Sequence, residues 1–275
     1  MLKTLSILLR PGALGAAILT VGALLGLAAC SPSGAEVEAC LEEGSCIAAL
    51  EVRDIPGNLP LNPDDPFWDS PRGPDTITVE LGPQMITNPK WPDPAIKKVT
   101  LGAVRNKGGI AILMEWEDPT VDNRYGPSDY YTDQAALMFP LVARKDAPSI
   151  TMGNENQTVN IWQWKAIWEK EGRSGRNKRL RERGNFLQDR VSPVEDLNAE
   201  GFSTLTIQEQ QDVKGRGLWR DKRWRVIFKR SLTDADSLDV QFRHSMQMAV
   251  AVWDGANRER NGQKGIAGWI LLRFG

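Results

Sequence analysis

Two apolar runs and the polar turn between them decide the fold in "MQMAVAVWDGANRERNGQKGIAGWILLRF", residues 246–274. Each run is rich in Val, Ile, Leu and Trp and is short enough for one strand, so the pattern predicts two β-strands. Lys264 stands at the start of the second run and shares strand parity with Ile266 and Ile270, so we expect it to point inward at a pocket edge. The alternative is a surface lysine of the turn, whose stem covers the end of the sheet.

The same texture extends back through most of the chain. Short β-like runs, separated by Gly, Asn, Asp or Pro clusters, are "KKVTLGAVR" (97–105), "GIAILMEWE" (109–117), "AALMFPLVAR" (135–144), "TVNIWQWKAIW" (158–168) and "RWRVIFKRSL" (223–232). This spacing is typical of an antiparallel β-sandwich or barrel. We therefore predict a mainly β domain over residues 96–275, with a few short helices.

The first thirty residues have the pattern of an exported bacterial protein. Residues 1–29 combine Lys3 and Arg10 with an apolar run that ends in "LAAC", which resembles a lipobox with Cys30 as the lipidated residue. A plain secretory signal is the alternative, and a permanent transmembrane helix is the weaker interpretation. Ser31 resembles an outer-membrane sorting signal, so the expected location is the periplasmic side of a bacterial membrane, lipid-anchored or free.

Residues 30–95 differ in composition from the remainder of the chain. They are rich in Pro, Asp and Gly, which favours a linker and an extended, turn-punctuated arm over helices. Cys40 and Cys46 are the other two of the three cysteines. In an oxidising compartment they are expected to form a local disulfide.

Charge and residue usage exclude several classes of function. The chain has 34 basic and 35 acidic residues, and removal of Lys3 and Arg10 with the leader leaves 32 against 35, so nucleic acid is not an expected partner. His244 is the single histidine, which argues against zinc sites and hydrolytic triads. Common catalytic motifs and the CxxCH sequence of c-type haem attachment do not occur. An enzyme is therefore not expected.

One segment interrupts the β pattern. Residues 170–190, "KEGRSGRNKRLRERGNFLQDR", are strongly basic and have little apolar periodicity. They predict a solvated loop with a short helix, or a docking surface for an acidic protein.

Four methionines in the β region are candidate ligands of haem iron, which accepts thioether sulfur: Met138, Met152, Met246 and Met248. Taken singly, each is more typical of core packing. Four segments nevertheless resemble, in order and spacing, the haem-b-binding gamma subunit of type II dimethyl sulfoxide reductase family enzymes, the group of ethylbenzene dehydrogenase, dimethyl sulfide dehydrogenase, selenate reductase and chlorate reductase. They are "AALMFP", "PSITMGNENQTVNIWQWKA", "RWRVIFKRSL" and "MQMAVAVWDGANRERNGQKGIAGWILL".

The resemblance covers roughly residues 52–275 and implies a two-sheet β-sandwich with one non-covalent haem b, held in a slot between the sheets. It assigns Met152 and Lys264 as iron ligands, with Met138 as the second choice for the sulfur. Trp164 is a candidate wall of the haem site. It further implies an electron-transfer subunit that relays electrons between a molybdopterin alpha subunit with its iron–sulfur beta subunit and a soluble or membrane cytochrome.

A lysine ligates iron only as the neutral amine. Deprotonating an ordinary lysine at pH 7 costs roughly 4 to 5 kcal/mol, and burial in an apolar pocket removes part of that cost by lowering the pKa.

Two other interpretations remain open at this point. A tryptophan-rich β-sandwich lipoprotein is also suited to binding carbohydrate or to surface adhesion. Alternatively, His244 together with a methionine ligates the haem.

Overall fold

The computed structural model describes residues 34–124, 130–144, 146–170 and 192–275. The predicted leader, the lipobox Cys30 and nearly all of the basic segment 170–190 lie outside these residues. From residue 32 onward the chain makes one compact unit. Among the described helices, none has both the length and the apolar character needed to cross a membrane.

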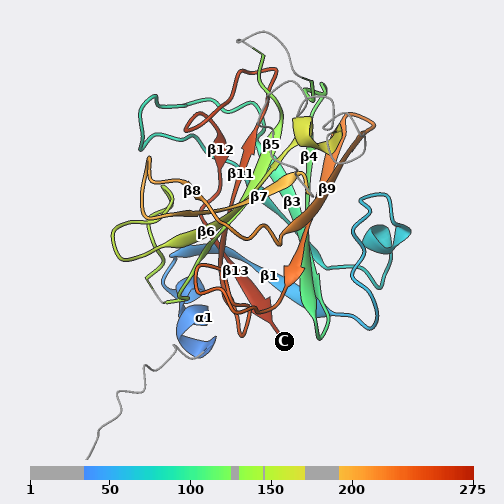
Figure 1. Cartoon of the computed structure of the whole chain (residues 1–275), viewed down its shortest axis with the longest axis vertical. Coiled ribbons are helices and arrows are strands. Elements are labelled where there is room, and N and C mark those ends of the chain that lie inside the picture. The colour runs from blue at the N-terminus through green and yellow to red at the C-terminus, as the bar shows by residue number, and fades with distance from the viewer. Residues whose placement is uncertain (1–33, 125–129, 145, 171–191) are drawn as a thin grey trace, which may run out of the picture. The chain divides into compact units, whose positions relative to one another are not determined.

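The described residues are mainly β, as predicted (Figure 1). The helices are α1 (Gly34–Glu42) and the 3-10 helices η1 (Pro66–Asp69) and η2 (Ala166–Lys170). The strands are β1 (Cys46–Asp54), β2 (Thr76–Glu80), β3 (Lys98–Arg105), β4 (Gly109–Glu117), β5 (Gln134–Pro140), β6 (Val159–Lys165), β7 (Val194–Ala199), β8 (Thr206–Ile207), β9 (Lys214–Arg220), β10 (Arg223–Ser231), β11 (Met246–Trp253), β12 (Gly265–Ile266) and β13 (Trp269–Phe274).

The strands form one hydrogen-bonded path that folds into two layers at β11. The order is β8-β7-β6-β5-β11-β13-β1-β3-β4-β10-β9, with β12 beside β11 and β2 beside β3. Residues 246–248 of β11 pair with β13, whereas residues 249–253 pair with β5, so β11 belongs to both layers (Figure 1). We call β13, β1, β3, β4, β10 and β9 the first layer, and β8, β7, β6, β5 and β12 the second layer.

The N-terminal arm differs from its prediction. Residues 46–54 form β1 inside the first layer, parallel to both β13 and β3, and α1 precedes them. The sheet is therefore mixed rather than purely antiparallel. Alternating burial explains the difference, because Leu50 and Val52 are buried in the core and require a place within the sandwich. The Pro-rich residues on either side of β2 keep an irregular course.

Buried tryptophans join the two layers. Trp164 of β6 packs against Trp224 of β10 and Trp116 of β4, with ring centroids 4.9 and 6.2 Å apart, and all three side chains are almost wholly buried. Aromatic pairs of this kind stabilise by about 0.5–1.5 kcal/mol each beyond the area that they bury. The space between the layers is therefore filled by side chains.

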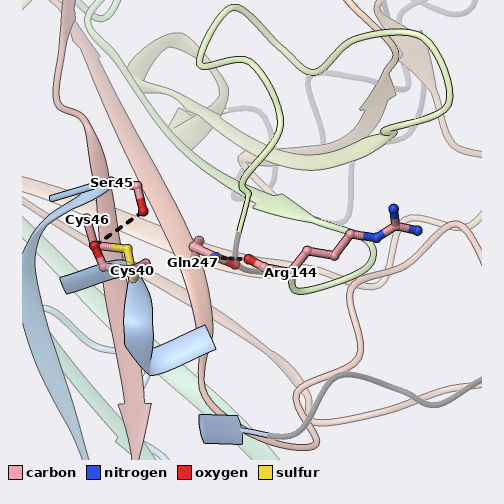
Figure 2. Close-up of a disulfide and its surroundings, with 5 residues drawn as sticks. All are labelled: Cys40, Ser45, Cys46, Arg144 and Gln247. Carbon is pink, nitrogen blue, oxygen red and sulfur yellow. Dashed lines mark hydrogen bonds between the residues drawn. A yellow bond between two sulfur atoms is a disulfide. The ribbon is translucent and has the colours of Figure 1, made fainter. Parts of the chain in front are cut away.

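A disulfide between Cys40 and Cys46 joins α1 to the start of β1 (Figure 2). Ser45 Oγ donates a hydrogen bond of 3.2 Å to the carbonyl of Cys40 within the same loop. Nearby, the side-chain amide of Gln247 on β11 donates to the carbonyl oxygen of Arg144 (Figure 2). These contacts fix the chain around the N-terminal end of β1.

Candidate functional site

A cavity of about 480 Å³ lies on the outer face of the second layer. Its floor consists of alternate residues of three adjacent strands: Gln134, Ala136 and Met138 of β5, Ile161, Gln163 and Lys165 of β6, and Ala249, Ala251 and Trp253 of β11. Three of these are alanines, whose small side chains leave space above the middle of the floor. Because side chains alternate along a strand, the large core residues of the same strands, such as Trp162, face the other way.

The loops that wall the cavity are tied together by Gln84. Its Nε2 donates to the carbonyls of Thr87 and Gly262, at 3.1 and 2.9 Å, and its Oε1 accepts from the backbone N–H groups of Ile86 and Thr87. Gln84 is buried, so these bonds satisfy an amide that burial would otherwise penalise. Two chain segments that are far apart in sequence thus form one continuous wall.

Lys264 lines this cavity, on the outer face of the second layer. Its Nζ lies 4.7 Å from the centroid of the Trp253 ring, and within the described residues it makes no ion pair or hydrogen bond. Burial lowers the pKa of Lys264 to about 8. At pH 7 the neutral amine then costs about 1.4 kcal/mol, compared with about 5 kcal/mol for an ordinary lysine.

Met152 reaches the cavity from a strained turn. Its φ is 73°, in the left-handed region that a non-glycine residue rarely adopts, and Gly153 follows with a φ of 82°. The carbonyl of Met152 accepts from Gly201 N at 2.8 Å, and Gly153 N donates to the carbonyl of Ser149 at 2.9 Å. A side chain at position 153 would approach the carbonyl oxygen of Gln157 to 2.7 Å, so only glycine fits there. The turn therefore holds the thioether at the cavity wall.

Met138 lies in the floor of the same cavity, between Ile161 of β6 and Ala249 of β11. The structure thus brings the two methionines assigned by the family resemblance, Met152 and Met138, to one cavity with Lys264, whereas Met246 and Met248 do not line it. Both thioethers remain candidates for the sulfur ligand.

Trp164 does not line the cavity, contrary to the expectation for the haem site. It lies on the inner face of β6, where its indole N–H donates to Glu169 Oε1 at 2.7 Å. Strand parity explains the difference, since residues 161, 163 and 165 face the cavity and residue 164 must face the core.

The location of the cavity also differs from the expected slot between the sheets. The interlayer space is occupied by the packed tryptophans, and the cavity lies between the second layer and the loops that cover it. His244 is not among the residues that line it, and its Nδ1 lies 3.1 Å from the carbonyl of Ser245. The geometry therefore does not support the interpretation with His244 as a ligand.

The charged side chains that line the cavity are all positive. Lys165, Arg260 and Lys264 line it, and among the described residues that line it there is no aspartate or glutamate. The guanidinium of Arg260 stacks over the Tyr131 ring at 4.6 Å, and Lys165 Nζ lies 4.4 Å from the Trp168 ring centroid. Sequence patterns did not identify Lys165 and Arg260 as residues of the site. Strand parity with Ile161 is the signal that identifies Lys165. Such a cavity suits a flat apolar molecule that carries acidic groups.

Comparison with known families gives a match over most of the chain. The family model described as ethylbenzene dehydrogenase matches residues 65–200 and 169–265. The two segments together cover residues 65–265, which include β5, β6 and β11 of the cavity floor.

Three curated relatives are similar over most of their length. A Haloferax mediterranei protein provisionally named respiratory nitrate reductase heme subunit ORF7 is 26% identical, covering 83% of this chain and 76% of its own. The chlorate reductase subunit gamma of Ideonella dechloratans is 27% identical, over 92% of this chain and 96% of its own. The dimethylsulfide dehydrogenase subunit gamma of Rhodovulum sulfidophilum is 27% identical, over 78% and 76%.

Solved structures are related only distantly. A Bacteroides uniformis protein provisionally named as carbohydrate-binding has 11% sequence identity and a TM-score of 0.43, over 83% of this chain and 99% of its own. A family 9 carbohydrate-binding module from Caldicellulosiruptor kristjanssonii, solved with glucose, has 9% identity and a TM-score of 0.39, over 82% and 95%. Similarity at this level supports no argument about a ligand.

Proposed function

This chain belongs to the ethylbenzene dehydrogenase family, and from that premise we propose that it is an electron-transfer subunit carrying one non-covalent haem b in the cavity of the second layer. The relatives reported above are named as gamma or heme subunits, and the chain is accordingly a non-catalytic subunit. The observation that carries the proposal is the meeting at one cavity of two methionines and a partly buried lysine that has no ion-pair partner within the described residues.

The residues of the cavity fit haem b in three respects. Its volume of about 480 Å³ lies within the range of roughly 300–1,000 Å³ that is usual for ligand pockets. Its alanine floor provides a flat apolar face for a porphyrin. Lys165 and Arg260 are cations suited to the two propionates. Bound haem supplies a single-electron couple, and a methionine ligand raises its reduction potential.

The side chains of this protein have distinct roles in the proposal. Lys264 is the nitrogen ligand, because its lowered pKa makes the neutral amine accessible near pH 7. Met152 is the sulfur ligand, since its strained turn holds the side chain at the cavity wall, and Met138 is the second choice. The covering loops, tied by Gln84, would shield the bound haem from water.

The partners follow from the proposed role. The subunit would relay single electrons between a molybdopterin alpha subunit with its iron–sulfur beta subunit and a soluble or membrane cytochrome. Its place would be the periplasmic side of a bacterial membrane, lipid-anchored through Cys30 or free. The direction of electron flow would follow the partner: outward for a dehydrogenase and inward for a chlorate or selenate reductase.

Carbohydrate binding is the alternative that the test must separate. Sugar platforms need exposed aromatic rings. Among the described residues, the large exposed hydrophobic side chains include one aromatic residue, Phe202, and no tryptophan. The buried tryptophans therefore favour the haem proposal.

Titration of the purified apoprotein with haem tests the proposal. We expect a red, stoichiometric complex whose pyridine adduct has a b-type spectrum. Lys264→Met should change the spectrum and weaken haem binding by about tenfold or more, equivalent to at least about 1.4 kcal/mol. The control Lys98→Met, at an exposed lysine that pairs with Glu80, should behave like the parent.

Parallel spectra of Met152→Leu and Met138→Leu identify the sulfur ligand, because only the ligating methionine changes the spectrum when it is replaced. A colourless protein that binds glycans would contradict the proposal. An unchanged spectrum in Lys264→Met would rule out the lysine ligand.

A further inference from the structure

A second polar feature of the fold lies outside the cavity lining. Asp118, which follows β4, Asp133, which precedes β5, and Asp254, which follows β11, are 0%, 0% and 7% exposed. One carboxylate oxygen from each lies within 4.8 Å of the others. Three buried carboxylates thus converge where three strand ends meet. We call them the carboxylate triad.

Three N–H donors hold Asp133 firmly in this position. Its Oδ1 accepts from Gly255 N at 2.9 Å, and its Oδ2 accepts from Asp122 N at 2.7 Å and from Trp224 Nε1 at 3.0 Å. All three donors are N–H groups, which favour the carboxylate over the acid form. The geometry of Asp133 is therefore set in advance of any ligand.

Asp118 leaves one oxygen without a partner. Its Oδ1 accepts from the backbone N–H and the hydroxyl of Thr120, at 3.0 and 3.1 Å. Its Oδ2 is buried and has no hydrogen-bond donor among the residues that the structure describes, and the same holds for Oδ2 of the neighbouring Asp122. A fully buried carboxylate oxygen without a donor needs either a proton or a cation.

The triad has no cation of its own within the described residues. None of its members forms an ion pair with lysine, arginine or histidine there. Burial raises the pKa of Asp118 to about 6 and that of Asp133 to about 8, and repulsion within the triad adds to both shifts. Burial also raises the pKa of Asp254. Any negative charge that the triad carries therefore has no paired cation within the described residues.

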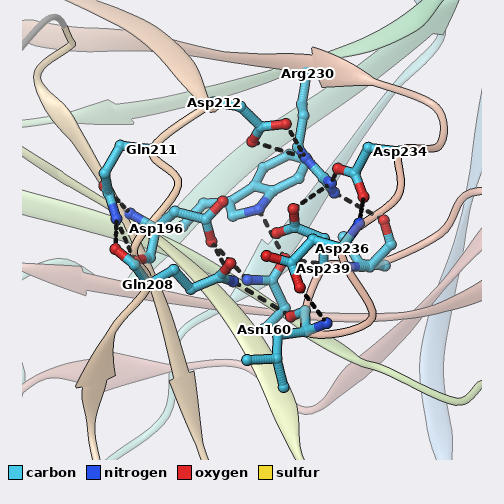
Figure 3. A network of polar contacts seen from close by, with 12 residues as sticks. Asn160, Asp196, Gln208, Gln211, Asp212, Arg230, Asp234, Asp236 and Asp239 are labelled. Atoms are coloured by element: carbon cyan, nitrogen blue, oxygen red, sulfur yellow. Dashed lines mark hydrogen bonds and ion pairs between the residues drawn. The ribbon is translucent and has the colours of Figure 1, made fainter.

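In a second acidic cluster of this protein, an arginine balances the negative charge of the carboxylates. Asp196, Asp212 and Asp239 also converge, but the buried Arg230 lies among them (Figure 3). Arg230 Nε is 2.9 Å from Asp212 Oδ1, and its Nη2 is 2.8 Å from Asp239 Oδ2. That cluster contains its own cation and serves as an internal reference.

We propose that Asp118, Asp133 and Asp254 together bind one calcium ion. The donors are all oxygens, which hard cations prefer, and the triad offers no nitrogen or sulfur to a transition metal. Calcium ligands lie about 2.3–2.6 Å from the ion, so two of them can be at most about 5 Å apart, and the triad meets this limit. Calcium also accepts irregular geometry more readily than magnesium does.

Terbium luminescence on the full chain, stripped of metal with a chelator and free of haem, tests this site. Trp224 contacts Asp133 directly, so terbium bound at the triad should be sensitised by excitation of tryptophan. We expect calcium to displace terbium, equimolar magnesium to displace much less, and calcium to raise the Tm by several degrees. Asp118→Asn should weaken calcium binding by about tenfold or more, since it removes one charge from the ligand set.

The matched control is Asp212→Asn, which changes the cluster that contains Arg230 and should leave the calcium response intact. If Asp118→Asn does not fold, Asp254→Asn replaces it, and the titration of the parent protein stands without either variant. A parent protein whose Tm calcium does not raise would overturn the proposal and leave a shared proton in the triad. Because haem is absent throughout, failure of the haem proposal leaves this result unaffected.

Discussion

Lys264 is the residue at which stability and the proposed function oppose each other. Its ammonium group is partly buried and has no counter-charge among the described residues, and this burial lowers its pKa from the ordinary 10.5 to about 8. A group whose folded-state pKa is lowered in this way destabilises the fold while it is protonated. The penalty is fully present below pH 8 and disappears as the pH rises from about 8 to about 10.5. Ligation by iron would remove it at neutral pH as well.

Lys264→Met should therefore act with opposite signs in the two forms of the protein. In the haem-free protein at pH 7 it should raise the free energy of unfolding by up to about 3 kcal/mol and abolish the rise in stability between pH 8 and 10.5. In the haem-bound protein it should destabilise. Urea unfolding across this pH range measures both effects. A variant as pH-dependent as its parent would contradict the lowered pKa of Lys264.

The turn at Gly153 provides a second test at the residue scale. Gly153→Ala introduces a Cβ 2.7 Å from the carbonyl oxygen of Gln157 at a φ of 82°, and we expect a loss of about 1–3 kcal/mol together with weaker haem binding. Gly57→Ala is the matched control, because Gly57 has a φ of 85° with open space around it. Equal effects of the two variants would mean that backbone strain alone, and not contact within the turn, sets the cost.

Among the structural elements, β5, β6 and β11 separate the two faces of the second layer by simple alternation. The faces carry different side chains because one packs on the first layer and the other forms the floor of the cavity. Alanine at positions 136, 249 and 251 keeps that floor low. The volume of the cavity thus depends on small residues whose side chains make few contacts.

Ala251→Leu should fill the floor without altering the core. Ala251 pairs with Ala136 on one side and with Ile266 on the other, so a larger side chain there must extend into the cavity. We expect haem affinity to fall by about tenfold or more, with a change of less than about 1.5 kcal/mol in the free energy of unfolding. Thr206→Leu, at an exposed position of β8 in the same layer, is the control. Unchanged haem affinity in Ala251→Leu would contradict the assignment of the floor.

Periodicity predicted the strands of this protein better than it predicted the site. Val-, Ile- and Trp-rich runs identify β3, β4, β5, β6, β10, β11 and β13, because side-chain alternation and burial are local properties. β1 was missed because its partners, β13 and β3, are distant in sequence and its flanks are irregular. Parity also separates Trp164 from Ile161, but only the covering loops decide which of the two faces holds the cavity.

For the molecule as a whole, the disulfide and the cavity lie on different parts of the fold. Cys40 and Cys46 join α1 to β1 of the first layer, whereas the cavity belongs to the second. The double variant Cys40→Ser, Cys46→Ser should lower the free energy of unfolding by about 2–3 kcal/mol, because the unfolded chain loses its cross-link. Reduced parent protein should match the variant in urea unfolding. Altered haem affinity in the variant would show that the two parts are coupled.

β11 gives its first half to one layer and its second half to the other, and the cavity floor rests on that second half. Sliding of the layers would break the backbone hydrogen bonds of β11, so the floor moves only as part of the whole sandwich. A redox centre seated on such a support keeps nearly the same surroundings in both oxidation states. Its reorganisation energy is then small, which favours rapid tunnelling of electrons over long distances.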